Sequence, residues 1–138
     1  MTLSGESFRT IWLNPADPGV VQVIDQRVLP HEYRVYDICS WRDGMRAISE
    51  MYVRGAPLIG ATAAWSLYLA ALEGNASVAS IRAAAAALLD SRPTAVNLRW
   101  AVERVLKEVE KAPSGSDLAA LLRAEAEAIC DEDIEQVV

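Results

Sequence analysis

The chain is poor in the residues that most often bind transition metals: its 138 residues include two cysteines and one histidine. Cys39 and Cys130 lie far apart and match no metal-ligand spacing, and His31 has no second histidine to act with it. This scarcity argues against a zinc site. Two free thiols fit a reducing cytoplasm, although two cysteines can also pair in an oxidising compartment.

Positive charge is also scarce, and the apolar runs are short. The 13 lysines and arginines are outnumbered by 19 acidic residues, for a formal net charge of −6, which argues against a nucleic acid or an anionic membrane as partner. The longest apolar run, residues 57–72, falls short of the ~20 residues that a membrane span needs. The first residues, with Glu6 and Arg9, lack the apolar segment of a signal peptide. We therefore expect a cytoplasmic protein without a membrane partner.

Apolar residues, in contrast, are abundant. They make up 52% of the chain, more than in an average soluble domain. The length suits a single domain that buries roughly two-thirds of its unfolded surface. We interpret the excess as apolar surface that packs against a missing domain or a second copy of the chain, and we expect a homodimer.

Three short runs near the N-terminus predict strands, because they are rich in β-branched and aromatic residues. They cover residues 11–13, 20–24 and 33–38. The segment NPADPG between the first two has the composition of a turn, so these two runs predict a hairpin. The sequence thus predicts a small antiparallel sheet of three strands.

From Trp41 onward the pattern is helical. It predicts helices over residues 41–52, 57–72, 78–90, 95–111 and 118–129, with Ser40, Ser77 and Asp117 as N-caps of the first, third and fifth. The helix over 57–72 is apolar almost all the way round and thin near Gly60, so we expect it at the centre of a bundle. The predicted fold class is α+β and mostly helical, with the small sheet followed by the helical bundle.

Residues 51–60, MYVRGAPLIG, contain the first candidate binding site. Pro57 suits the first position of a helix, and Gly55 and Ala56 leave the backbone open to a ligand. Free N–H groups at the helix start and the nearby Arg54 guanidinium together suit a phosphate or a carboxylate. The alternative is that this segment is only a tight joint and that Arg54 pairs with an acidic neighbour.

Arg92 is the second candidate, because it also precedes a proline at a predicted helix start. Two arginines at two helix N-termini can converge on one doubly charged phosphate through bidentate bonds. The alternative is that Arg92 simply ends the preceding helix, where a cation is favourable near the negative end of the helix dipole.

Several motifs together resemble one known family. They are IDQRVLP at 24–30, AI at 47–48 with Met51, VRGAPLIG at 53–60, SRPTAVNL at 91–98 and WA at 100–101. In this order they resemble the N-terminal part of the 5-methylthioribose-1-phosphate isomerases. That branch belongs to the family that also contains the regulatory subunits of eukaryotic translation initiation factor 2B. The resemblance extends from about residue 24 to residue 104.

The resemblance implies a function for the whole domain. It implies that Arg54, Gly55, Ala56 and Arg92 contact the phosphate of a sugar-phosphate substrate, and that no metal or organic cofactor takes part. It further implies that residues 1–138 are a single N-terminal domain of a two-domain isomerase. The cysteine and aspartate that perform the isomerisation lie in a Rossmann-like C-terminal domain that this sequence does not contain, so we expect no catalytic residue here. Cys39 and Cys130 lie outside the position of that cysteine.

Two departures and three alternatives accompany the resemblance. Leu58 stands where the family often has alanine, and Trp65-Ser66 where an aromatic–glycine pair is usual; these residues could narrow or reshape the pocket. The alternatives are a regulatory binding module of the initiation-factor type, an isomerase of ribose 1,5-bisphosphate, and a stand-alone helical interaction domain. The residues that separate the two isomerases lie in the absent domain.

Overall fold

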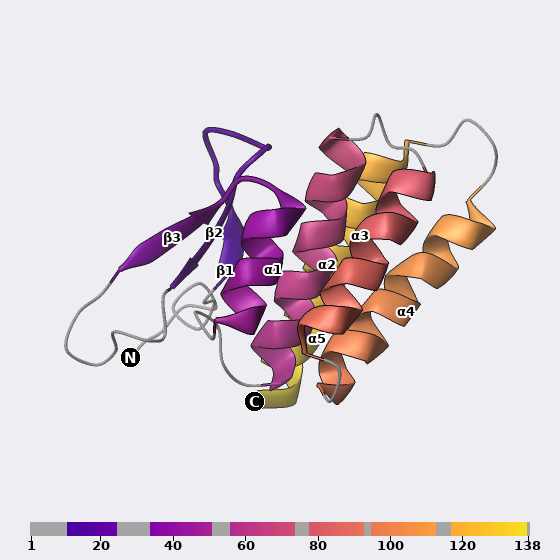
Figure 1. Cartoon of the computed structure of the whole chain (residues 1–138). Helices are drawn as coiled ribbons and strands as arrows, with labels where there is room; N and C mark the ends of the chain where they lie inside the picture. The colour runs from indigo at the N-terminus through magenta and orange to yellow at the C-terminus, as the bar shows by residue number, and fades with distance from the viewer. Residues whose placement is uncertain are drawn as a thin grey trace.

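The computed structural model describes residues 11–24, 34–50, 56–73, 78–92, 95–112 and 117–137. Within these ranges a small sheet precedes a bundle of helices (Figure 1). The strands are β1 (Ile11–Leu13), β2 (Val21–Ile24) and β3 (Val35–Ile38), and the helices are α1 (Trp41–Ser49), α2 (Ala56–Glu73), α3 (Val78–Ser91), α4 (Val96–Lys111) and α5 (Leu118–Val137). The predicted fold class, α+β and mostly helical, is confirmed.

The sheet has the antiparallel order β1-β2-β3 that the sequence predicts. Its strands alternate between two faces, and the face toward the helices carries buried Ile11, Val21, Val23 and Ile38. The opposite face carries a polar ladder. Trp12 Nε1 donates to Gln22 Oε1 at 2.9 Å, and Gln22 Nε2 donates to Asp37 Oδ1 at 3.0 Å.

The predicted turn between β1 and β2 is confirmed, and two of its side chains accept backbone hydrogen bonds. Asn14 Oδ1 accepts from the N–H of Ala16 at 2.8 Å, and Asp17 Oδ1 accepts from the N–H of Gly19 at 2.9 Å. Such local bonds fix tight turns. The Asn14 N–H donates to the Val20 carbonyl at 2.9 Å and closes the hairpin.

Helix α2 is the central helix, as predicted. It packs against α1, α3, α4 and α5 and also contacts β1, and every residue from Ile59 to Ala71 is buried. A helix with no polar face is stable only when neighbours cover all of its sides.

Two glycines allow neighbouring helices to approach α2 closely. A Cβ at Gly60 would lie 3.2 Å from the Asn97 carbonyl oxygen and 3.6 Å from the Ala101 Cβ, so α2 and α4 nearly touch there. This close approach was expected from the small residues of α2. A Cβ at Gly44 of α1 would lie 1.9 Å from Ser66 Oγ, so α1 and α2 are in direct contact as well.

Two of the three predicted N-caps lie in the described ranges, and both are confirmed. Ser40 Oγ accepts from the Asp43 N–H at 3.3 Å, and Asp117 Oδ1 accepts from the Ala120 N–H at 3.1 Å. The third, Ser77, lies outside the described residues.

The predicted helix ends need two corrections. Helix α1 ends at Ser49 rather than near residue 52. Helix α5 continues to Val137 rather than stopping at Ile129. The prediction ended α5 where the acidic segment DEDIEQVV begins, yet that segment contains no glycine or proline, the residues that interrupt a helix most strongly.

Candidate functional site

The structure describes two of the four predicted site residues, Ala56 and Arg92. Arg54 and Gly55 lie outside the described residues. Ala56 is the first residue of α2, which therefore begins one residue before Pro57. Residue 57 lies in the first turn of the helix, where a backbone N–H group would have no partner within the helix. A proline, which has no N–H group, is therefore tolerated there.

The N-terminal ends of α2 and α4 lie side by side. Figure 1 shows both helices starting at the same end of the bundle. The tight contact of Gly60 with Asn97 joins the second turn of α2 to the first turn of α4. The segment RGA ends at the first residue of α2, and Arg92 precedes α4. The two candidate segments thus lead into neighbouring helix starts.

The positive ends of these two helices carry no compensating negative charge of their own. Neither α2 nor α4 has an acidic residue in its first turn. The residue at the N-cap of α4 is Ala95, which makes no side-chain cap hydrogen bond. Uncapped N–H groups at a helix start attract an anion through direct hydrogen bonds and through the helix dipole.

Arg92 follows the last residue of α3 and is half-buried. Its carbonyl accepts from the Ala95 N–H at 3.0 Å, which fixes its backbone at the turn into α4. Within the described ranges its guanidinium has no carboxylate partner. Arginines with such partners are Arg42 with Glu73, Arg46 with Glu50, Arg82 with Glu110, Arg99 with Glu103, Arg104 with Glu125, and Arg123 with Glu127. Within that part of the chain, no carboxylate therefore engages the five N–H donors of the Arg92 side chain.

This arrangement can hold a small anion at the shared end of α2 and α4. The position of Arg92 directly after α3 also agrees with the alternative that it ends that helix. The convergence of Arg54 and Arg92 on one point stays a prediction, because Arg54 lies outside the described residues.

Large apolar side chains border the start of α4. Val96, its first residue, is 77% exposed, and Trp100, one turn further on, is 47% exposed. The Arg104 guanidinium lies 5.4 Å from the centre of the Trp100 ring. These two side chains add exposed apolar area next to the Arg92 turn.

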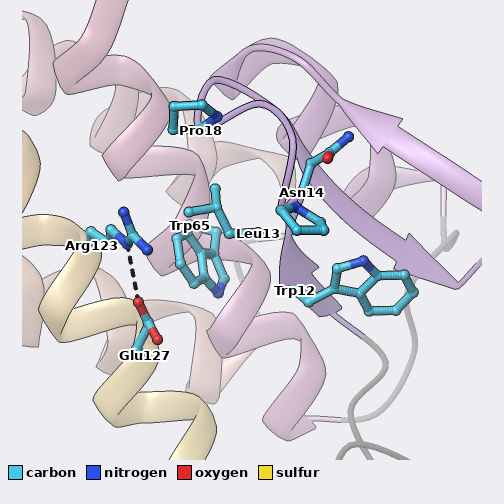
Figure 2. Close-up of a pocket in the computed structure, with 8 residues that line it drawn as sticks. Trp12, Leu13, Asn14, Pro18, Trp65, Arg123 and Glu127 are labelled. Carbon is cyan, nitrogen blue, oxygen red and sulfur yellow. Dashed lines mark hydrogen bonds and ion pairs between the residues drawn. The ribbon is translucent and has the colours of Figure 1, made fainter.

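The departures from the family pattern at Trp65 and Ser66 lie away from this end, near the middle of α2. Ser66 is fully buried against Gly44, and its Oγ donates to the Thr62 carbonyl at 2.7 Å. Trp65 lines a separate pocket together with residues of the β1–β2 turn and of α5 (Figure 2). The sequence reasoning missed this pocket, although two prolines and a tryptophan around that turn are an unusual concentration of rigid side chains.

The described residues offer no metal site: no group of three or more histidine, cysteine, aspartate or glutamate side chains in them is arranged to hold an ion. None of the described helices combines the length and the apolar character required to cross a bilayer.

Cys39 is exposed, and its thiol is expected to react slowly. Desolvation by its surroundings raises the pKa of the Cys39 thiol, and the carboxylates of Asp43, Asp37 and Asp17 raise it further. A raised pKa means less thiolate at neutral pH, and the thiolate is the nucleophile. In a Cys130→Ser variant, alkylation by iodoacetamide should therefore rise with pH at a higher midpoint than in a short cysteine peptide. A midpoint at or below that of the peptide would contradict this.

Comparison with known proteins identifies relatives over nearly all of the chain. Residues 52–137 match the sequence model of the Initiation factor 2 subunit family. The methylthioribose-1-phosphate isomerase of Cereibacter sphaeroides is 44% identical over 135 residues, which are 98% of this chain and 36% of that protein. The protein of the same name from Methylorubrum populi is 46% identical over 134 residues, 97% of this chain and 36% of that protein.

Two solved structures share the fold. The 5-methylthioribose 1-phosphate isomerase of Pyrococcus horikoshii OT3 superposes with a TM-score of 0.81 at 36% identity, over 90% of this chain and 36% of that one. The translation initiation factor eIF-2B, subunit delta, from A. fulgidus gives a TM-score of 0.82 at 32% identity, over 92% of this chain and 38% of that one. The chain spans little more than a third of the curated relatives that it matches.

Proposed function

Since the chain belongs to the Initiation factor 2 subunit family, we propose that it is the N-terminal, phosphate-binding domain of a sugar-phosphate isomerase. The proposed reaction converts the aldose 5-methylthioribose 1-phosphate to the ketose 5-methylthioribulose 1-phosphate in methionine salvage. The names of the relatives in Cereibacter sphaeroides and Methylorubrum populi support this substrate. The proposed protein is cytoplasmic and works as a homodimer.

The observation that carries the proposal is the shared end of α2 and α4. There Arg92 has no carboxylate partner in the described part of the chain, and two helix starts without an acidic residue in their first turns lie side by side. A phosphate monoester carries up to two negative charges and three terminal oxygens, which suits a guanidinium together with backbone N–H groups. We propose Arg54, Gly55, Ala56 and Arg92 as its ligands.

In the proposed reaction this domain holds the substrate while the rest of the protein performs the chemistry. The phosphate blocks the anomeric carbon, so the sugar ring must open before hydrogen moves between C1 and C2. Clamping the phosphate orients these two carbons and supplies binding energy for the reaction. The proton-transfer groups lie in the proposed C-terminal domain. Val96 and Trp100, beside the Arg92 turn, are exposed apolar side chains. This apolar surface supports the proposal that a second domain closes over the site.

A chimera tests the proposal. Residues 1–138 should replace the matching N-terminal third of the Cereibacter sphaeroides isomerase, to which they are 44% identical. The chimera is expected to convert methylthioribose 1-phosphate, whereas the isolated 138-residue chain is expected to show no turnover. A folded chimera without activity would contradict the proposed function, and turnover by the isolated chain would contradict the division of labour between the two domains.

A second candidate is a binding module of the initiation-factor type, which the similarity to the eIF-2B subunit delta structure favours. A regulatory module needs no turnover, so an inactive, well-folded chimera that still binds phosphate would favour this candidate. Ribose 1,5-bisphosphate, offered to the chimera as a competing substrate, tests the related isomerase.

A further inference from the structure

The pocket around Trp65 is separate from the shared end of α2 and α4. It has a volume of about 430 Å³ and lies between the β1–β2 turn, α2 and α5. Trp12, Leu13 and Pro18 form one side, and Arg123 and Glu127 of α5 form the other (Figure 2). Cavities of this size, lined by rigid aromatic and proline side chains, suit a small organic molecule.

The two tryptophans of this pocket differ in their hydrogen bonds. Trp12 Nε1 donates to Gln22 Oε1 at 2.9 Å. Trp65 is 1% exposed, and its Nε1–H has no acceptor within the described residues. Figure 2 shows the Trp65 nitrogen turned toward the space between Trp12 and Glu127. A buried donor without an acceptor is unfavourable, so an acceptor brought to it by a ligand would form a hydrogen bond with little competition from water.

The wall around Trp65 is held in place by its neighbours. The Tyr68 hydroxyl donates to the Pro18 carbonyl at 2.5 Å and ties the β1–β2 turn to α2. The Tyr68 ring also packs edge-on against the Trp65 ring, with centroids 5.5 Å apart. The β1–β2 turn and the Trp65 ring are therefore held in place relative to α2.

The two charges at the rim of the pocket are paired with each other. Arg123 Nε and Glu127 Oε2 form an ion pair at 3.1 Å, and the two side chains lie one helical turn apart on α5. Because the two charges pair with each other, the rim offers no net charge that favours an anion or a cation. An uncharged ligand leaves the pair intact.

We propose that this pocket binds an uncharged small molecule with a flat apolar body and one hydrogen-bond acceptor, which accepts from Trp65 Nε1–H. The half-buried Trp12 ring and the prolines of the turn hold the flat body, and the side chains around the nitrogen adjust to admit the acceptor. The site does not depend on the proposed isomerase function, because it uses other residues on other sides of the bundle.

Two probes of nearly equal shape test the acceptor. Acetophenone carries a flat ring and a carbonyl oxygen, and α-methylstyrene replaces that oxygen with a CH2 group. In a variant with Trp12, Trp41 and Trp100 each changed to Phe, the one remaining indole N–H resonance belongs to Trp65. This assigns the same resonance in the spectrum of the unmodified chain, where both probes are titrated.

Acetophenone is expected to move the Trp65 indole N–H resonance downfield and to bind about two- to tenfold more tightly than α-methylstyrene. Trp12→Ala removes one wall while leaving Trp65 in place, and it should weaken both probes. Equal affinities for the two probes, no response of the Trp65 resonance, or a response confined to another tryptophan would each overturn the proposal.

Discussion

Replacing Arg92 with alanine is expected to lower the affinity of the chain for inorganic phosphate by about ten- to a hundredfold. Arg92 is half-buried and has no carboxylate partner within the described residues. Losing one charge-assisted hydrogen bond costs about 1.5–3 kcal/mol of binding free energy, which corresponds to a loss in affinity of about ten- to a hundredfold. Isothermal titration calorimetry with phosphate at low ionic strength measures this effect.

Arg99→Ala is the matched control. Arg99 lies in the same region of α4, is exposed, and has Glu103 as partner at 3.8 Å, so its loss removes one positive charge without removing the proposed ligand. We expect its effect on phosphate affinity to be small, and Arg92→Lys to fall between Arg92→Ala and the unmodified chain, since a point charge does not replace the planar fork. Unchanged phosphate binding in Arg92→Ala would mean that Arg92 only ends α3 and is not a phosphate ligand. Equal losses in Arg92→Ala and Arg99→Ala would indicate a nonspecific charge effect.

Gly44→Ala is expected to lower the free energy of unfolding by about 1–3 kcal/mol, the usual range for an overpacked core. The added Cβ would lie 1.9 Å from Ser66 Oγ and 2.9 Å from Ser66 Cβ. A rotation of the serine hydroxyl removes only the first of these clashes, so α1 and α2 must move apart. The higher helix propensity of alanine offsets part of the cost. Urea unfolding followed by circular dichroism measures the difference.

The partner substitution shows whether the helix contact causes the loss. Ser66→Gly removes both clashing atoms, so the Gly44→Ala/Ser66→Gly double variant should recover stability relative to Gly44→Ala alone. The coupling energy of the double-mutant cycle should reach at least 1 kcal/mol, as for residues in direct contact. Gly44→Ala with raised stability would mean that the two helices separate without cost.

Local pattern was sufficient to predict most of the fold. Short runs of β-branched and aromatic residues predicted the sheet, and Ser40 and Asp117 marked helix starts that the structure confirms. The ends of α1 and α5 were wrong, because stop signals are weaker than caps: the acidic end of α5 lacks both a breaker and a clear period. Arg92 was found from its place before a proline, and the motifs that pointed to the family reached the same residue.

The features that could not be predicted depend on contacts between residues that lie far apart in the sequence. Gly44 lies inside a helix, where glycine is unfavourable, and this could have indicated a close contact. The identity of its partner, Ser66 in another helix, follows only from the packing. The lack of an acceptor for Trp65 Nε1–H among the described residues is likewise invisible in the sequence, because the letter W does not show whether the ring nitrogen has a hydrogen-bond partner.

The apolar circumference of α2 constrains how this domain unfolds. Because α1, α3, α4 and α5 all pack on it, detaching any one of them exposes apolar surface of the central helix to water. Separating a neighbour is therefore costly, and α2 cannot persist as an isolated helix once several have left. We therefore expect that no part of the bundle stays folded without the rest. Its helices should open together, with the amides of α2 exchanging their hydrogens at the rate of global unfolding.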